Sequence, residues 1–264
     1  MKEQQGTGRL PHGRILAAPS WVIPAGVAEN CRFLAGRVDE VGLLFLESEA
    51  CLAYSRHDLP VDLADLPLSW HVHLPVDLPW GTARARPETA HRDGSRCADI
   101  CLRLMDKVDY LGAVRGVVHP PAYCHAAYAA QALEAFTAAW TAAGLRPEDI
   151  LLENIQGQPL TELAETVRSL GLSVCLDTGH MLSYGQHGIL RDARLTGRIR
   201  MLHLNAERAG RHVPLTVLHD EALRVCASAV QAAPCDSVVM MELFDWKEIE
   251  ESLPVAVMWL RGSG

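Results

Sequence analysis

The sequence contains little lysine and no long hydrophobic run. Of its 24 basic residues only Lys2, Lys107 and Lys247 are lysines, and the formal net charge is −8. A chain of this charge lacks the electrostatic footprint of a protein that binds DNA or an anionic membrane. No window reaches the roughly 18 uninterrupted apolar residues that a membrane span needs. These shortages argue against nucleic acid and membranes as partners.

The N-terminus also lacks the apolar core of a signal peptide, since it reads Met1-Lys-Glu-Gln-Gln. We therefore expect a cytoplasmic protein. Several of its eight cysteines lie within helical or strand patterns rather than in a small loop-rich scaffold, as is typical of a reducing compartment. Cys97 and Cys101 could share one helix face and bind a metal. Because no second cysteine pair completes such a site, buried free thiols are the favoured interpretation.

Signatures of nucleotide-binding folds are missing as well. No Gly-x-Gly-x-x-Gly follows a predicted strand, and no Gly-Lys-Ser/Thr motif occurs. The composition, 49% hydrophobic and 21% charged, is that of a globular protein, and no break in it marks a domain boundary. We expect one domain over residues 1–264, of which residues 1–12 form a loose N-terminal segment.

Short apolar runs alternate along the chain with segments of helical period, which predicts repeated βα units and a parallel sheet. Helical spacings end at Gly144 and Gly171, and the last helix contains Pro254, which would bend or start it. Eight strands and a length of 264 residues predict an α/β fold, the (β/α)₈ TIM barrel, with a doubly wound open sheet as the alternative. The predicted strands are Arg14–Ala18, Val41–Leu46, Ser69–Leu74, Gly116–His119, Ile150–Glu153, Leu172–Leu176, Arg200–Leu204 and Val238–Leu243.

Side chains that bind metals recur where these strands end. In a barrel the C-terminal ends of the parallel strands meet on one face, so residues that are distant in sequence converge there. A structural ion pair could also satisfy a buried glutamate, and a simple turn could explain an Asp-Thr-Gly-His sequence. The repeated placement favours a shared site. Its members at or after strand ends are His73, His119, Glu153, Asp177, His180, His203 and Glu242.

Imidazole and carboxylate together suit Zn²⁺, Mn²⁺ or Fe²⁺. So many ligands exceed what one four-coordinate ion requires, and this predicts more than one divalent metal. A metal pair can lower the pKa of a water molecule and stabilise both oxygens of a phosphoester displacement.

The same motifs resemble those of the xylose isomerase-like barrel superfamily, which includes the endonuclease IV type of abasic-site nuclease. That nuclease family holds a metal cluster with His-x-Pro, His-Pro, a strand-ending Glu, Asp-x-x-His, His-x-Asn, Asp-Arg-His and a final Glu. This chain reads Gly210-Arg211-His212, so the aspartate before Arg-His is missing and two metals are predicted rather than three. The resemblance implies eight metal ligands: His73, His119, Glu153, Asp177, His180, His203, His212 and Glu242.

Three segments resemble a narrower family, the cobamide-remodelling phosphodiesterases. They are Ala17-Ala-Pro-Ser-Trp-Val-Ile-Pro, residues 28–41, and His73-Leu-Pro-Val-Asp-Leu-Pro-Trp. This resemblance implies a corrinoid substrate related to vitamin B12, whose nucleotide loop is cleaved to cobinamide phosphate and an α-riboside. The predicted catalytic residues are Glu153, Asp177 and Glu242.

Two other functions are open to a barrel with this ligand set. One is a sugar isomerase or epimerase with one divalent ion. Lys107 falls within a helical pattern and Lys247 after the last strand, so no strand-end lysine can polarise a sugar carbonyl or form a Schiff base, which argues against it. The other is a metal-containing protein that binds a corrinoid or a sugar without turnover.

Overall fold

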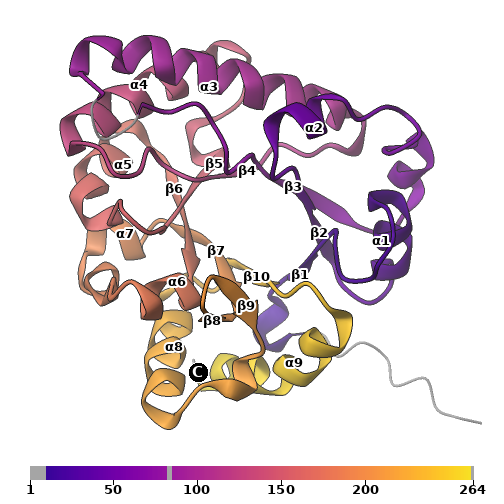
Figure 1. Cartoon of the computed structure of the whole chain (residues 1–264). Helices are drawn as coiled ribbons and strands as arrows, with labels where there is room; N and C mark the ends of the chain where they lie inside the picture. The colour runs from indigo at the N-terminus through magenta and orange to yellow at the C-terminus, as the bar shows by residue number, and fades with distance from the viewer. Residues whose placement is uncertain (1–9, 82–84, 263–264) are drawn as a thin grey trace, which may run out of the picture.

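The chain forms a closed barrel of eight parallel strands in a computed structural model that describes residues 10–81 and 85–262 (Figure 1). Neighbouring strands follow chain order around the ring, and the last strand closes onto the first. The predicted (β/α)₈ barrel is therefore confirmed, and the open-sheet alternative is wrong. The barrel strands are β1 (Leu16–Pro19), β2 (Glu40–Leu44), β3 (Ser69–His73), β4 (Gly116–Val118), β5 (Ile150–Glu153), β6 (Ser173–Asp177), β7 (Ile199–Leu204) and β10 (Val238–Met241).

Helices surround the barrel and bury its outer face (Figure 1). A second, smaller apolar cluster fills the barrel interior and includes Leu151, Met201 and Met240. The lumen is thus a packed core, and polar side chains gather at its two ends. The helices are α1 (Val27–Leu34), α2 (Ser48–Leu52), α3 (Pro87–Lys107), α4 (Ala126–Ala142), α5 (Ala164–Leu170), α6 (Thr178–Ser183), α7 (Ala193–Thr196), α8 (Asp220–Ala232) and α9 (Trp246–Arg261).

Helix ends follow the predicted signals in part. Gly171 caps α5 with a left-handed φ of 75°, and its N–H donates to the Arg168 carbonyl. Helix α9 begins well before Pro254 and continues through it, because Asp245 caps the first turn by accepting the Lys247 N–H. The exposed proline lies on the solvent side, where water can satisfy the carbonyl that it leaves free.

Several boundaries differ from the prediction. Strand β6 extends to Asp177, which is also the N-cap of α6, so the Asp-Thr-Gly-His segment forms a short helix rather than an open turn. Helix α3 stops at Lys107, and a separate 3₁₀ helix follows at Asp109–Leu111. Residues 1–9 lie outside the described residues, and beyond them Pro11–Gly13 form a 3₁₀ helix within the segment expected to be loose.

The sequence did not predict a hairpin of β8 (Ala206–Arg208) and β9 (Arg211–Val213) that follows β7. Ala209 and Gly210, with φ values of 52° and 74°, form its two-residue turn. The hairpin packs against α6 at the mouth of the barrel (Figure 1).

Cys97 and Cys101 are free thiols buried on the inner side of α3. Burial raises the pKa of Cys97 to about 12, which keeps its thiol neutral and suits a packing role. Among the described helices, none is both long enough and apolar enough to cross a membrane.

A buried charge cluster lies at the N-terminal end of the barrel. Glu40 opens β2, and its Oε1 lies 2.6 Å from His71 Nδ1 while its Oε2 accepts from Arg115 and Ser69. Burial opposes the charged carboxylate, but the hydrogen bond from His71 and the charges of His71 and Arg115 outweigh it. Together they lower the pKa of Glu40 to about 2.

Replacing Glu40 by Ala should lower the free energy of unfolding by about 3 kcal/mol, because Arg115 and His71 lose their buried partner. The pKa of about 2 lies below the ordinary value of 4.5, so this stabilisation is complete at neutral pH and declines as the pH falls through 4.5. Urea unfolding at about pH 7 and about pH 4 measures both effects. If the free energies of unfolding of wild type and variant differed by the same amount at both pH values, the lowered pKa of Glu40 would be contradicted. Glu49→Ala, on the exposed face of α2, is the control and should change little.

Candidate metal centre

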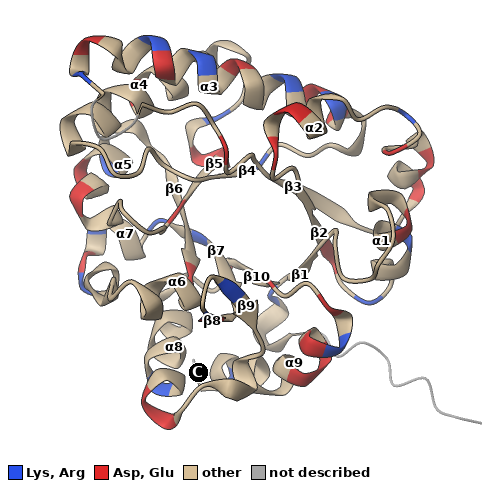
Figure 2. Cartoon of the chain, in the orientation of Figure 1, with Lys and Arg blue, Asp and Glu red and all other residues tan. Residues whose placement is uncertain are grey.

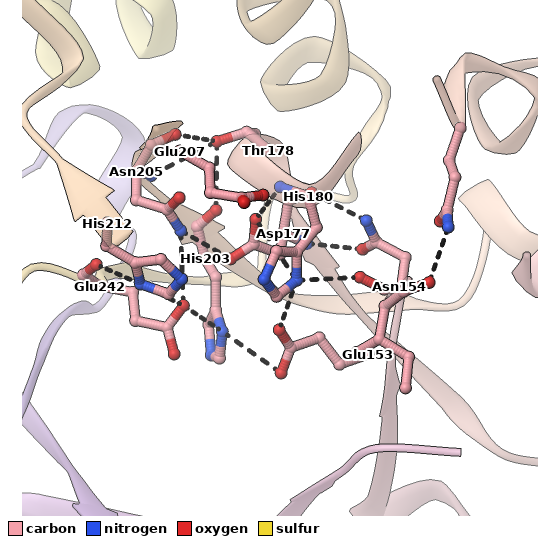
Figure 3. Close-up of polar contacts among 12 residues, drawn as sticks. Glu153, Asn154, Asp177, Thr178, His180, His203, Asn205, Glu207, His212 and Glu242 are labelled. Atoms are coloured by element: carbon pink, nitrogen blue, oxygen red, sulfur yellow. Dashed lines mark hydrogen bonds and ion pairs between the residues drawn. The ribbon is translucent and has the colours of Figure 1, made fainter. Parts of the chain in front are cut away.

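The eight predicted ligands converge at the C-terminal end of the barrel. Figure 3 shows Glu153, Asp177, His180, His203, His212 and Glu242 among them. Five barrel strands deliver them directly: His73, Glu153 and Asp177 end β3, β5 and β6, His203 lies in β7, and Glu242 follows β10. The remaining three lie just beyond strands. His119 follows β4, His180 lies in α6, and His212 lies in β9.

The fully buried carboxylate of Glu153 lies at the centre of this group. Its Oε2 is 3.2 Å from His73 Nε2 and 3.3 Å from His119 Nε2. Its Oε1 is 3.1 Å from His180 Nδ1. One carboxylate thus faces imidazoles from three different parts of the chain.

Glu242 forms a second focus. Its Oε2 lies 3.2 Å from His203 Nδ1 and 3.4 Å from His212 Nδ1, and its Oε1 lies 3.8 Å from His73 Nε2. The two glutamates therefore share His73 as a neighbour and lie on either side of it.

Asp177 is held between two asparagines. Its Oδ2 accepts from Asn205 Nδ2 at 2.6 Å, and its Oδ1 accepts from the His180 N–H at 2.6 Å. The Asn154 side chain bonds both the N–H and the carbonyl of Asp177. A Cβ at Gly179 would lie 2.0 Å from Asn205 Oδ1, so the glycine of the Asp-Thr-Gly-His segment makes room for this amide.

Backbone carbonyls orient three of the imidazoles. His73, His180 and His212 each place Nδ1 at 3.1 Å from a carbonyl oxygen, of Leu74, Asn154 and Glu242 respectively. A ring that donates Nδ1–H in this way keeps Nε2 free as a lone-pair donor. This arrangement is typical of histidines that bind metals.

Charge is poorly balanced among these side chains. Burial, and then repulsion from Glu153, raises the pKa of Glu242 well above its ordinary value. For Glu153 burial is outweighed by His119, His180 and His73, which lower its pKa well below the ordinary value. Burial opposes the charged form of His180, but Asp177 and Glu153 raise its pKa to about 10. Closely packed carboxylates of this kind favour a bound cation.

Buried polar atoms that form no hydrogen bond indicate whether these residues suit a bound metal ion. His203 Nε2 is buried and has no hydrogen-bond partner within the described residues. Such an atom normally costs about 1–3 kcal/mol, and a bound ion would satisfy it. His203 Nδ1 and Glu153 Oε1 also form no hydrogen bond within the described residues, although they lie 3.2 Å from Glu242 Oε2 and 3.1 Å from His180 Nδ1. Their nitrogen and oxygen donors suit Zn²⁺, Mn²⁺ or Fe²⁺, so the residues fit.

Donor atoms of the described residues gather into five overlapping groups compact enough to hold an ion. Three of these groups share Glu153: His73, His119 and Glu153; Glu153, Cys175 and His203; and Glu153, Asp177, His203 and Glu242. The other two are His73, His203 and Glu242, and Asp177, His180 and His212. The last group forms without a side chain from Gly210, which lies in the hairpin turn.

A cavity of about 540 Å³ opens above these residues. Leu46, Val76 and Phe244 form apolar parts of its wall, and Arg211 lies on the hairpin side. The Phe244 ring stacks on His212 with 5.3 Å between centroids.

Sequence reasoning assigned no role to Asn154, Asn205, Phe244 or Arg211. The two asparagines could have been found, since Asn154 directly follows Glu153 and Asn205 lies two residues beyond His203. Phe244 and Arg211 carry a weaker signal, adjacency to predicted ligands.

Comparison with known proteins supports the fold. The sequence matches the family of xylose isomerase-like TIM barrels over residues 55–262. No curated protein matches it. Among solved structures, a D-tagatose 3-epimerase-like protein superposes with a TM-score of 0.70 at 15% identity, covering 94% of this chain and 98% of that one.

Endonuclease IV from Thermus thermophilus superposes with a TM-score of 0.64 at 20% identity, covering 94% of this chain and 99% of the nuclease. An L-ribulose 3-epimerase gives 0.63 at 14% identity, with 95% of each chain covered. These likenesses establish a shared architecture. Together with the sequence match, they show that the chain belongs to the xylose isomerase-like TIM barrel family.

Proposed function

We propose that the protein is a metal-dependent phosphodiester hydrolase that cleaves the nucleotide loop of a cobamide to cobinamide phosphate and an α-riboside. The observation that carries the proposal is the buried carboxylate of Glu153, which belongs to three overlapping groups of metal-binding donors. A shared carboxylate is typical of centres in which two ions act on one phosphoester.

Two divalent ions held here would lower the pKa of a water molecule and neutralise charge on the phosphoryl oxygens. The residues of the chain would hold the ions and orient their ligands. Glu153 and Glu242 would hold the ions through their carboxylates, while Asn205 and Asn154 fix the orientation of Asp177. Apolar residues of the cavity wall limit the access of bulk water to the reacting atoms.

Two of the three segments that resemble cobamide-remodelling enzymes lie at the mouth of the barrel. Residues 17–24 begin within β1 and continue to the exposed Trp21, which lines a separate hollow, and residues 73–80 begin at the last residue of β3 and include the exposed Val76 of the cavity wall. An exposed apolar side chain such as Val76 beside a metal-binding site suits a substrate with a large ring system. Its position supports a corrinoid as the substrate.

A sugar epimerase shares this fold and is the second candidate, because an epimerase-like protein gives a TM-score of 0.70. Neither of the two described lysines is placed to act on a sugar substrate, which does not favour an epimerase. Lys107 donates to the Tyr54 carbonyl outside the barrel, and Lys247 lies in the first turn of α9. Neither side chain lines the cavity.

Purified protein supplied with Zn²⁺, Mn²⁺ or Fe²⁺ should release the α-riboside from a complete cobamide, as followed by liquid chromatography and mass spectrometry. Glu153→Gln should lower the rate at least about 100-fold, since it removes the shared carboxylate charge. Glu148→Gln, an exposed glutamate far from the cavity, is the matched control and should keep full activity.

Three outcomes would redirect the assignment. Failure to release the riboside with all three ions would refute the hydrolase. Interconversion of ketohexoses under the same conditions would indicate the epimerase instead. Tight retention of the intact cobamide without product would indicate a binding protein.

Asn205→Ala should weaken metal binding about 10- to 100-fold, because Asp177 and Glu242 lose the amide that orients them. Gly179→Ala should have the same effect, since its methyl group would displace that amide. Competition with a coloured chelator measures the affinity. Gly197→Ala, exposed and remote from the site, is the control. Equal affinity in the Gly179 and Gly197 variants would contradict this role for the amide.

A further inference from the structure

The cavity above the candidate metal centre has one basic side chain on its wall. Among its lining residues Arg211 is the only lysine or arginine, and Asp245 and Glu248 are the acidic residues beyond the candidate ligands. Figure 2 shows the basic hairpin beside the barrel opening, next to the acidic start of α9. A substrate that enters this cavity therefore meets one guanidinium group and no lysine among the lining residues.

The backbone that carries Arg211 is held firmly in place. Its neighbour His212 bonds through Nδ1 to the Glu242 carbonyl, which ties β9 to the end of β10. The tight turn at Ala209 and Gly210 then closes the hairpin, and Arg211 pairs directly with Arg208 across it. Arg211 thus lies one residue from a candidate metal ligand, on a strand with little freedom to move.

The guanidinium of Arg211 is itself uncommitted. Within the described part of the chain it forms no hydrogen bond and no ion pair at contact distance, although it interacts electrostatically with Glu248. Arg208 differs, because its Nη2 donates to the Val217 carbonyl at 3.0 Å and its side chain lines a separate cavity. Arg211 lies beside a metal-binding site and has no internal hydrogen-bond partner among the described residues. It can therefore bind a ligand without first breaking a hydrogen bond within the protein.

We propose that Arg211 binds an anionic phosphoryl oxygen of the substrate. This inference rests on the proposed phosphodiester hydrolase and names the protein group that recognises the charged part of its substrate. The planar guanidinium presents paired N–H donors that match two phosphoryl oxygens, which makes arginine well suited to phosphate. The apolar residues Leu46 and Val76 line the same cavity, and Phe244 stacks on His212 beside Arg211, so the guanidinium is the polar group of the hairpin side that can take the anion.

Isothermal titration of the metal-loaded protein with inorganic phosphate tests the proposal. Arg211→Ala should raise the dissociation constant about 10-fold, because a charge-assisted pair of hydrogen bonds is lost. Arg211→Lys should fall between the alanine variant and the wild type, since lysine keeps the charge but not the paired donors. Arg208→Ala is the matched control on the same hairpin and should bind phosphate as the wild type does.

Turnover separates this inference from the proposed function. In a protein that releases the riboside, Arg211→Ala should lower kcat/KM for the cobamide, whereas Arg208→Ala should leave it unchanged. Riboside release with equal phosphate affinity in wild type and Arg211→Ala would overturn the role of Arg211 and leave the hydrolase intact. Weaker phosphate binding by Arg211→Ala in a protein without phosphodiesterase activity would keep the anion site and refute the hydrolase.

Discussion

Three carboxylates lie buried within a few side chains of one another at the C-terminal end of this barrel, and their charge has to be balanced. Glu153, Asp177 and Glu242 have almost no contact with solvent, and the lumen beneath them is filled by apolar residues such as Leu151 and Met201. Water therefore cannot balance the charge. The surrounding imidazoles reach each carboxylate only in part, and buried donor atoms remain unsatisfied. Divalent cations complete this arrangement better than any protein group nearby.

Barrel closure makes the arrangement possible. The ends of β3, β4, β5, β6, β7 and β10 bring the donors to the rim, so no pair of neighbouring strands could assemble the set alone. Secondary contacts then fix the donors: backbone carbonyls orient histidine rings, and Asn205 passes close to Gly179 to reach Asp177. The charge cluster of Glu40, His71 and Arg115 lies at the other end of the barrel, with the apolar lumen between the two.

The mouth of the cavity is chemically asymmetric. Val76 and Phe244 contribute apolar surface, whereas the hairpin contributes Arg211 beside the acidic start of α9. A substrate with a broad apolar body and one anionic group matches both features, and a phosphodiester attached to a ring system has that form. A long polyanion would meet too little positive charge here, in agreement with the acidic net charge of −8.

The sequence alone was enough to predict the barrel, because buried strands that alternate with amphipathic helices leave a periodic pattern. It predicted β5 with its observed bounds, Ile150–Glu153, since an apolar run ends there at a charged residue. Strand-end position also singled out seven of the eight candidate ligands, and His212 was added only by the resemblance to the endonuclease IV motifs. Only the tertiary structure decided which donors face one another, since His73 and Glu153 are 80 residues apart and meet only after the ring closes. It also decided the hairpin, because strands of three residues are too short to show periodicity. The only local signal that Arg211 would line the cavity was its position next to His212.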